Sequence, residues 1–403
     1  MQGGRIAVVG GSIAGCAAAL ALGRAGAEEI TVYERASGRM AERGVGVAVH
    51  NDRYAELEAA GYIDASVPWA RIVHNRFYVR DDTAAHDPRG REVAVMPFPF
   101  RTYNWGSLWQ DLRRRAPATV DFRTGTAIET VEVTPEGAAV HTAGRTEHHD
   151  VLIGADGYRS TVRAALYADI RPEYAGYLAW RGAYPVSRLP DADLFPEDEG
   201  AYVLFEGGHL VVYRIPDETG GHRVNWVLYA TPPPGLDQGM HTPTSVPPGT
   251  AGDALRDRLA HICAESLPPF WAGLVQETTP AELLLQPIYD FTAPHYAVDR
   301  ALLVGDAATV ARPHTGAGAV KALQDITLLE TSLTSATTWS EGLAAYDAGR
   351  APVGQAMVGL GRRLGQALVT GTPNWRTFDQ TALETWWKEA TGAGGFGGRQ
   401  LKR

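Results

Sequence analysis

The sequence comprises 403 residues with a formal net charge of −9, and 45% of its residues are hydrophobic and 21% charged. A chain of this length favours two closely joined domains, and the composition is that of an ordinary globular protein. The acidic balance argues against a nucleic-acid-binding protein, which would normally carry a basic surface. No apolar run approaches the roughly 20 residues that span a bilayer, and Cys16 and Cys263 are too few for a disulfide framework. We therefore expect a cytoplasmic protein without membrane segments.

The first fifty residues predict a strand, a glycine turn, a helix and a second strand. An apolar run at 6–9 precedes the glycine-rich residues 10–15, an alanine-rich helix follows, and a second apolar run ends at Glu34. This order is typical of a dinucleotide-binding fingerprint. Gly10 permits the turn and Gly15 lets helix and strand pack closely. The helix N-terminus presents free amides to a pyrophosphate, and Glu34 can accept hydrogen bonds from ribose hydroxyls.

The fingerprint departs from its usual form at the middle glycine, which is Ser12 here. A small side chain still lets phosphate approach, and its hydroxyl can donate to it. Glu34 favours FAD or NAD over a nucleotide with a 2′-phosphate, although Arg35 beside it weakens that argument. From this unit we predict nucleotide contacts at Gly10, Ser12, Ile13, Ala14, Gly15, Glu34 and Arg35.

Two distant motifs repeat a second pattern, in which an apolar strand delivers an aspartate at its carboxyl end. Residues 150–157 end in Asp156 and Gly157, and residues 301–308 contain Gly305 and Asp306. Open α/β sheets bind their ligands at this edge. A glycine-rich loop at 313–318 follows the second motif and leads into an apolar helix.

With these three motifs the sequence resembles the class A flavoprotein monooxygenases, the p-hydroxybenzoate hydroxylase type. The resemblance implies FAD as cofactor, NADH or NADPH as co-substrate, and O₂ as oxidant. It places Asp306 on the ribitol chain, Asp156 and Gly157 near the pyrophosphate, and Arg43 and Gly44 close to the flavin. The loop against the isoalloxazine would comprise Pro313, Gly316, Ala317 and Gly318. Because this loop opens a helix, its amides would stabilise negative charge on reduced flavin.

The sequence departs from the family pattern at four positions, which puts individual side-chain contacts in doubt but not backbone contacts. They are Trp105 for an arginine, Thr309 for a histidine, Ala317 for a glutamine and Val320 for an asparagine.

The resemblance also implies an α/β (mixed α+β) fold with a discontinuous Rossmann-like FAD-binding domain and a β-sheet substrate domain. We assign residues 1–72, 101–171 and 284–370 to the FAD-binding domain. Segments 73–100 and 172–283 alternate apolar and polar residues as half-buried strands do, so we assign them to the substrate domain. The proline-rich segment 231–250 is predicted to be a surface loop or a substrate lid. Residues 371–403 would form a C-terminal helix and a flexible tail.

Candidate substrate contacts lie in the alternating segments. His209 and Tyr213 share one face of a predicted strand, a pattern that is often only polar surface. The resemblance to the dihydroxypyridine and hydroxynicotinate hydroxylase branch implies catalytic or substrate-contacting roles for His209, Tyr213 and His314. Arg181 and His50 are further substrate-binding candidates. Histidine ordinarily titrates near neutral pH, so His209 is the first choice as base.

We therefore expect an FAD-dependent monooxygenase that hydroxylates an electron-rich aromatic or N-heteroaromatic ring through a flavin C4a-hydroperoxide. The alternatives are a flavin-dependent epoxidase or halogenase-like oxidoreductase and a non-catalytic flavin-binding redox sensor; a tryptophan-halogenase signature is absent. The histidines are scattered, so no metal site is predicted. The expected partners are a small aromatic molecule and O₂, with neither nucleic acid nor membrane, in a monomer or homodimer.

Overall fold

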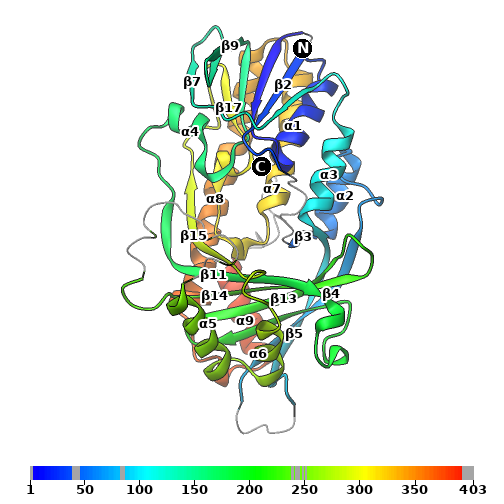
Figure 1. The fold of residues 1–403 in the computed structure, drawn as a ribbon, viewed down its shortest axis with the longest axis vertical. Coiled ribbons are helices and arrows are strands. Elements are labelled where there is room, and N and C mark those ends of the chain that lie inside the picture. Colours follow the sequence, from blue (N-terminus) through cyan, green and yellow to red (C-terminus); the bar gives the residue numbers. More distant parts are fainter. Residues whose placement is uncertain are drawn as a thin grey trace.

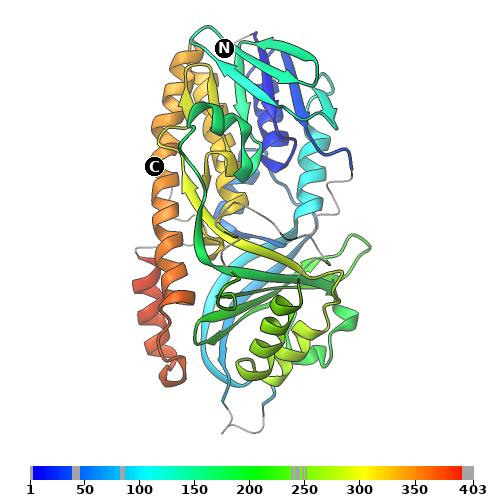
Figure 2. The same cartoon turned by 60° about the vertical axis from the view of Figure 1, so that its left-hand side comes forward.

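The computed structural model describes residues 3–38, 46–81, 87–236, 240, 246, 249 and 252–392. This part of the chain forms two large sheets at opposite ends of an elongated molecule, joined by a long helix (Figures 1 and 2). No helix within these ranges is both long enough and apolar enough to cross a membrane.

The first sheet has six strands in the spatial order β16–β17–β10–β1–β2–β6. All neighbouring pairs are parallel except β16 with β17. The three strands that carry the predicted motifs, β1, β10 and β17, are therefore neighbours, and their carboxyl ends meet at one edge. The strands are β1 (Arg5–Val9), β2 (Glu29–Glu34), β6 (Asp121–Thr124), β10 (Val151–Gly154), β16 (Ala297–Val298) and β17 (Ala301–Leu303).

Helices and a small sheet cover both faces of these strands, which explains why they read as continuous apolar runs. Helix α1 packs against α3 and α7. The covering helices are α1 (Ile13–Arg24), α2 (Asn51–Ala59), α3 (Trp105–Arg115), α4 (Thr161–Leu166) and α7 (Gly318–Ser335). The small antiparallel sheet comprises β7 (Thr130–Val133), β8 (Ala138–Thr142) and β9 (Arg145–His149).

The second sheet has nine strands in the order β18–β15–β11–β14–β13–β12–β4–β5–β3. Most neighbours are antiparallel, as short connections between consecutive strands allow. The strands are β3 (Gly46–His50), β4 (Trp69–Val79), β5 (Arg91–Asn104), β11 (Glu173–Pro185), β12 (Glu199–Phe205), β13 (Gly208–Pro216), β14 (His222–Ala230), β15 (Leu284–Thr292) and β18 (Thr309–Val310).

The two faces of the second sheet are covered by different helices. On one face, α5 (Asp253–Glu265) and α6 (Pro269–Gln276) bury Trp180 and Trp226. The opposite face packs against the end of α8 (Trp339–Gly365), the π-helical turn η8 (Gln366–Thr370) and α9 (Gln380–Thr391). Helix α8 also contributes to the core of the first sheet, so it ties the two sheets together (Figure 2).

Strands β4, β5 and β15 of the second sheet lie across or beyond the domain boundaries that the sequence predicts. Strand β15 begins at Leu284, where we placed the return to the FAD-binding domain, but it pairs along β11 in the nine-stranded sheet. Strands β4 and β5 likewise extend beyond 73–100. A strand with both faces buried shows the same apolar sequence pattern in either sheet, so hydrophobic periodicity could not show which sheet β15 belongs to. The tail beyond residue 392 and most of 237–251 lie outside the described residues.

Candidate flavin and substrate site

The turn after β1 requires glycine at two positions. Gly10 has a φ of +102°, and a Cβ there would lie 2.3 Å from the carbonyl oxygen of Ala155, just after β10. A Cβ at Gly15 would lie 1.8 Å from the carbonyl oxygen of Gly10. Side chains cannot fit at these distances, so the two glycines let the turn sit directly against the Asp156 motif.

The N-terminus of α1 is suited to an anion. Its N-cap residue, Ser12, makes no side-chain capping bond, and the first turn holds no acidic residue. The first amides of a helix have no partner within the helix, so those of Ile13 and Ala14 and the Ser12 hydroxyl can donate to phosphate oxygens. The backbone N–H of Gly11 instead donates to Glu34 Oε2 at 2.8 Å. A carboxylate accepts several hydrogen bonds, so Glu34 retains capacity for ribose hydroxyls.

The Asp156 turn holds an acceptor without a partner. Asp156 Oδ2 accepts from the backbone N–H of Thr161 at 2.7 Å, whereas Oδ1 is buried and has no hydrogen-bond partner among the described residues. Burial raises the pKa of this carboxyl. Arg163 then joins the two aspartate motifs, because it donates to the carbonyl oxygens of Ala307, at 3.1 Å, and Tyr158, at 2.6 Å.

Three buried ionic side chains hold the backbone at the Gly305 turn. Gly305 has a φ of +57° and donates its N–H to Asp325 Oδ2 at 2.9 Å. Lys321 Nζ donates to the same oxygen at 2.6 Å and to the Gly305 carbonyl at 3.1 Å. Arg350 Nε binds Asp325 Oδ1 at 2.7 Å. We name these three the Asp325 cluster: Lys321, Asp325 and Arg350. Asp306 itself is exposed, although crowding by protein raises its pKa, as expected for a carboxyl in the wall of a binding site.

The loop ahead of α7 presents a second helix N-terminus. The turn η7 (Pro313–Thr315) leads to Gly316 in the left-handed region, and the N-cap Ala317 has no side chain able to cap the helix. The first turn of α7 holds no acidic residue. Its amides therefore fit an electron-rich group, as the isoalloxazine of reduced flavin is.

Together these features of the described residues fit FAD: the N-termini of α1 and α7 have no side-chain cap there, Asp156 Oδ1 is a buried acceptor without a partner among them, and glycines allow close approaches. Arg35 follows the last residue of β2 and is exposed, and Arg43 and Gly44 lie outside the described residues. Two of the residues that depart from the family pattern are buried in the protein. Thr309 forms a hydrogen bond with Thr292 Oγ1 at 2.7 Å, and Val320 lies in the hydrophobic core. One contact that we did not predict is Trp109, whose Nε1 donates to the Gly11 carbonyl at 2.8 Å.

Two of the candidate substrate residues come together on the second sheet. His209 of β13 and His314 of η7 have ring centroids 5.2 Å apart, although they are far apart in the sequence. Tyr229 of β14 lies opposite His209 in the strand register, and the centroid of its ring is 4.5 Å from that of His314. His209 Nδ1 faces the Leu368 carbonyl at 3.2 Å, and His314 Nε2 bonds the Tyr177 hydroxyl at 2.7 Å. We name His209 and His314 the histidine pair.

The histidine pair is neutral at physiological pH. Burial lowers the pKa of His209 to about 4 and that of His314 well below its usual value. For His314, repulsion by a protonated His209 and by Arg312 would lower the pKa further. The prediction that His209 titrates near neutral pH is therefore wrong, because its burial depends on residues far along the chain, such as Leu368, that the strand pattern does not show. His314 Nδ1 is buried without a hydrogen-bond partner in the described part of the chain.

Tyr213 and Arg181 lie further along the same face, which is partly exposed there. Gly46 packs against Tyr213, where a Cβ would lie 2.7 Å from its ring, and donates its N–H to Asn225 Oδ1 at 3.1 Å. Burial raises the pKa of Tyr213 to about 12, and the positive charge of Arg181 acts in the opposite direction. Burial also raises the pKa of Tyr229, and the positive charge of Arg181 again opposes that rise. The structure thus places a cation beside both tyrosines.

His50 lies apart from the histidine pair. It is the last residue of β3, and its Nδ1 accepts from the backbone N–H of Asp52 at 3.1 Å, which caps helix α2. Its ring meets Phe100 edge-on, with centroids 5.0 Å apart. Asn225, Tyr177 and Tyr229 were not predicted as site residues. Tyr229 and Asn225 share a strand face, but only the register with β13 shows that this is the face of His209.

Comparison with known proteins agrees with this geometry. A family model described as an FAD binding domain matches residues 5–183 and 261–360, and one described as FAD binding domain-like matches 174–285. Because the first covers more than half of the chain, the protein belongs to the FAD binding domain family. It is a class A flavoprotein monooxygenase that uses FAD as its cofactor, as the sequence predicted.

The relatives have aromatic substrates in their names. A 2,6-dihydroxypyridine 3-monooxygenase of Paenarthrobacter nicotinovorans is 30% identical over 382 residues, covering 91% of this chain and 92% of the relative. A kynurenine 3-monooxygenase of Salinispora tropica is also 30% identical, covering 86% of this chain and 76% of the relative. The solved 2,6-dihydroxypyridine-3-hydroxylase from Arthrobacter nicotinovorans superposes with a TM-score of 0.80 at 26% identity over 94% of this chain and 96% of that one.

Proposed function

We propose that this FAD-dependent monooxygenase hydroxylates an electron-rich aromatic or N-heteroaromatic ring. The ring would be held between strands β13 and β14 and the loop at residues 313–318 ahead of α7, which we name the flavin loop. The observation that carries the proposal is the histidine pair, because it joins the flavin loop to the sheet through two neutral, buried imidazoles. The names of the relatives agree with a hydroxypyridine or an amino- or hydroxy-substituted benzene.

When bound at the N-termini of α1 and α7, FAD would supply the activation of oxygen, with NADH or NADPH as the reductant and O₂ as the oxidant. The protein must then make one ring carbon more nucleophilic. With a proton on Nδ1 donated to the Leu368 carbonyl, His209 keeps its lone pair on Nε2. That nitrogen can accept a hydrogen bond from a substrate hydroxyl or ring N–H, and sharing this proton increases electron density on the ring.

The low pKa of His209 sets how this proton moves. A buried imidazolium is costly by itself, so a proton taken by His209 is stable only beside the negative charge that it leaves on the ring. Arg181 stands further along the same face and supplies positive charge there, with Tyr213 beside it as a hydrogen-bond donor whose pKa of about 12 keeps it protonated. His314 Nδ1, which has no partner in the described residues, offers a second position for the substrate.

Aromatic rings exclude water around the pair. His209 stacks on Tyr202 and Tyr229, with centroids 5.9 and 5.0 Å away, and Tyr177 binds His314. Excluding water protects an activated oxygen from being lost before transfer. The same rings keep the two imidazoles neutral.

The test is the yield of hydroxylated product per NAD(P)H consumed, measured with 2,6-dihydroxypyridine and a panel of phenols. His209→Ala should lower this ratio by about 100-fold, the lower end of what a positioned acid or base contributes, while FAD absorbance per protein stays unchanged. His209→Gln, which keeps an acceptor, should recover part of the yield. His148→Ala, at an exposed histidine of β9, is the control. An unchanged yield in His209→Ala would remove His209 from the mechanism.

A further inference from the structure

The two ring nitrogens of His314 lie in different surroundings. Nε2 is 2.7 Å from the hydroxyl oxygen of Tyr177, whereas Nδ1 is buried and has no hydrogen-bond partner in the described part of the chain. Burial lowers the pKa of His314 well below its usual value, so the imidazole is neutral and carries its proton on one nitrogen and a lone pair on the other. The position of that proton decides whether Nδ1 donates to a ligand or accepts from it.

The surroundings of the Tyr177 hydroxyl favour one of these two states. Tyr177 lies on β11 with its side chain buried, and burial raises the pKa of its hydroxyl, which therefore keeps its proton. Among the hydrogen bonds of the described residues, His314 Nε2 is the one acceptor that this hydroxyl meets. A proton on Nε2 would leave both the Tyr177 O–H and the Nδ1 lone pair without partners, whereas a proton on Nδ1 leaves only that N–H. Because buried polar groups without partners are costly, the proton belongs on Nδ1.

Arg312 directs the Tyr177 hydroxyl in the same way. Its guanidinium carbon lies 5.7 Å from the centroid of the Tyr177 ring, and its Nε donates to the buried Asp290 Oδ2 at 2.7 Å. Gly365 leaves room for both groups, since a Cβ there would lie 2.6 Å from the Tyr177 hydroxyl oxygen and 3.0 Å from Arg312 Nη1. A guanidinium has donors but no acceptor, so Tyr177 cannot turn its hydrogen toward Arg312. The Tyr177 hydroxyl is therefore a donor to His314.

His209 has the complementary form. Its Nδ1 faces the Leu368 carbonyl at 3.2 Å, and a carbonyl oxygen only accepts, so His209 carries its proton on Nδ1 and its lone pair on Nε2. The two imidazoles, whose ring centroids are 5.2 Å apart, thus offer one acceptor and one donor. A hydroxyl group can donate to the first and accept from the second at the same time.

We propose that Tyr177 is a positioning residue that keeps the proton of His314 on Nδ1, so that His314 donates a hydrogen bond to the oxygen of a ring hydroxyl. The inference rests on the proposed function, which places the reacting ring at the histidine pair. When the hydroxyl proton passes to His209 Nε2, the electrons of the O–H bond stay on the oxygen, and the His314 N–H stabilises that negative charge. A ring amino group shares its lone pair with the ring and accepts poorly. The histidine pair should therefore select a ring hydroxyl over a ring amino group.

The position of the proton can be measured directly by NMR of the FAD-loaded protein with ¹⁵N-labelled histidine at neutral pH. The signals of His314 are those that disappear in His314→Asn. We expect a protonated Nδ1 and an unprotonated Nε2 in the unmodified protein. In Tyr177→Phe the proton should be shared between the two nitrogens. Tyr174→Phe, which removes another hydroxyl of β11, is the control and should leave the proton on Nδ1.

Calorimetry with phenol and aniline measures the consequence for binding to the FAD-loaded protein. Phenol should bind about fivefold more tightly than aniline, the effect of about one additional hydrogen bond. His314→Leu should remove this preference, whereas His314→Asn, whose amide can donate, should retain part of it. In Tyr177→Phe the affinity for phenol should fall in proportion to the Nδ1-protonated fraction seen by NMR, while the affinity for aniline stays unchanged. Equal weakening of both compounds would overturn the positioning role of Tyr177.

The outcomes separate this inference from the function on which it rests. If no ring compound is hydroxylated, but His314 carries its proton on Nδ1 and His314→Leu removes the preference for phenol, the proposed function falls and this assignment stands. If phenols are hydroxylated while His314 carries its proton on Nε2, or while phenol and aniline bind equally, the assignment is overturned. Failure of both compounds to bind would overturn it as well. Because the proton is located in the unmodified protein, the test holds even if Tyr177→Phe fails to retain FAD.

Discussion

The two ends of this molecule are built from different interactions. At the end that we propose for the nucleotide, the structure presents helix amides, glycine turns and buried ion pairs. At the substrate end, the second sheet presents aromatic rings and two neutral histidines. A site that must bind the same cofactor in every turnover can be fixed by backbone geometry, whereas a site that selects a ring depends on side chains.

The Asp325 cluster shows how the nucleotide end is held. Lys321 and Arg350 are both buried, and burial alone would lower the pKa of each. The charge of Asp325, its hydrogen bonds and the neighbouring tyrosines Tyr296 and Tyr346 together outweigh burial, so the pKa of both groups is raised and both stay protonated. The cluster has no contact with the second sheet among the hydrogen bonds of the described residues. Its effect is on the Gly305 turn, and through it on Asp306.

The largest expected effect is therefore at Asp325. Asp325→Asn keeps an oxygen for the Gly305 N–H but removes the charge that pairs with Lys321 and Arg350. Breaking a buried ionic pair in this way costs about 3 kcal/mol or more, so we expect a loss of that size in the free energy of unfolding, measured by denaturant titration, together with weaker FAD binding.

The matched control is Asp253→Asn, which removes a partner of Arg256 on α5, where the Asp253 side chain is 85% exposed. An exposed ion pair contributes between 0 and about 1 kcal/mol, so this variant should be nearly neutral. Equal losses in the two variants would contradict the view that the nucleotide end depends on buried charge.

A smaller effect is expected at the substrate end, where His209 should make the free energy of unfolding depend on pH. The pKa of His209 falls from 6.5 to about 4 on folding, so between these values the unfolded chain binds more protons than the folded one. The stability that comes from keeping His209 neutral is present above pH 6.5 and is lost as the pH falls toward 4, by up to about 1.4 kcal/mol per pH unit.

Denaturant titrations between pH 7.5 and 5 check this dependence. His209→Asn cannot titrate in this range, so its free energy of unfolding should fall less steeply on acidification than that of the unmodified protein. His148→Asn, which alters an exposed histidine, should retain the steep fall. If His209→Asn and the unmodified protein show the same slope, His209 is not the buried neutral group described here.

The local structure of the nucleotide end could be predicted from the sequence more fully than that of the substrate end, for a physical reason. Local features decide the former: Gly10 and Gly15 are demanded by a turn and a close approach that a strand–turn–helix unit specifies by itself. Asp156 and Gly305 follow apolar strands directly, and parallel strands bring their ends to one edge. The Asp325 cluster was not predicted, since Lys321 and Arg350 meet only after α7 and α8 pack together.

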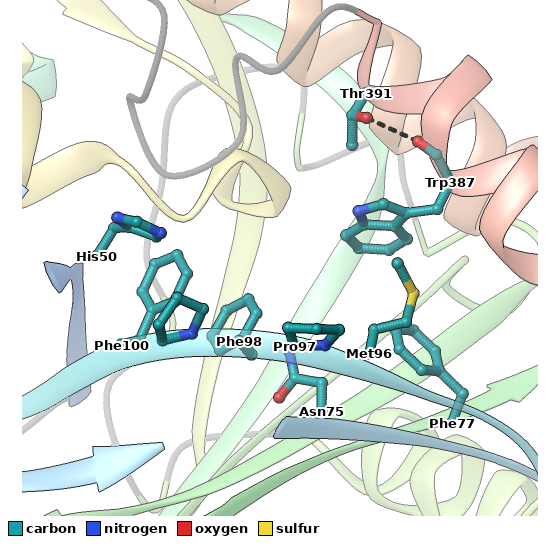
Figure 3. Close-up of a pocket in the computed structure, with 10 residues that line it drawn as sticks. His50, Asn75, Phe77, Met96, Pro97, Phe98, Phe100, Trp387 and Thr391 are labelled. Atoms are coloured by element: carbon teal, nitrogen blue, oxygen red, sulfur yellow. Dashed lines mark hydrogen bonds between the residues drawn. The ribbon is translucent and has the colours of Figure 1, made fainter. Parts of the chain in front are cut away.

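At the substrate end, the pairing of strands decides which side chains meet. His209 and Tyr213 were predicted to share a face, which is a property of a single strand. Their partners depend on register across the sheet, so Tyr229 and Asn225 were missed. Burial was missed for the same reason: the turn η8 covers His209 from far along the chain, and its low pKa follows from that cover. A cavity of about 250 Å³ lined by His50 of β3, Phe77 of β4, Met96 of β5 and Trp387 of α9 forms only when these elements pack together, which no single segment could show (Figure 3).

The most direct test of the central claim, that FAD-dependent oxygen transfer takes place at the histidine pair, is hydroxylation under ¹⁸O₂ with the product analysed by mass spectrometry. For the unmodified protein we predict that the ring product gains a single ¹⁸O atom and that its amount approaches the amount of NAD(P)H consumed. In His209→Ala, NAD(P)H oxidation should continue with little labelled product. Product labelled from water, or full labelled yield in His209→Ala, would contradict the account.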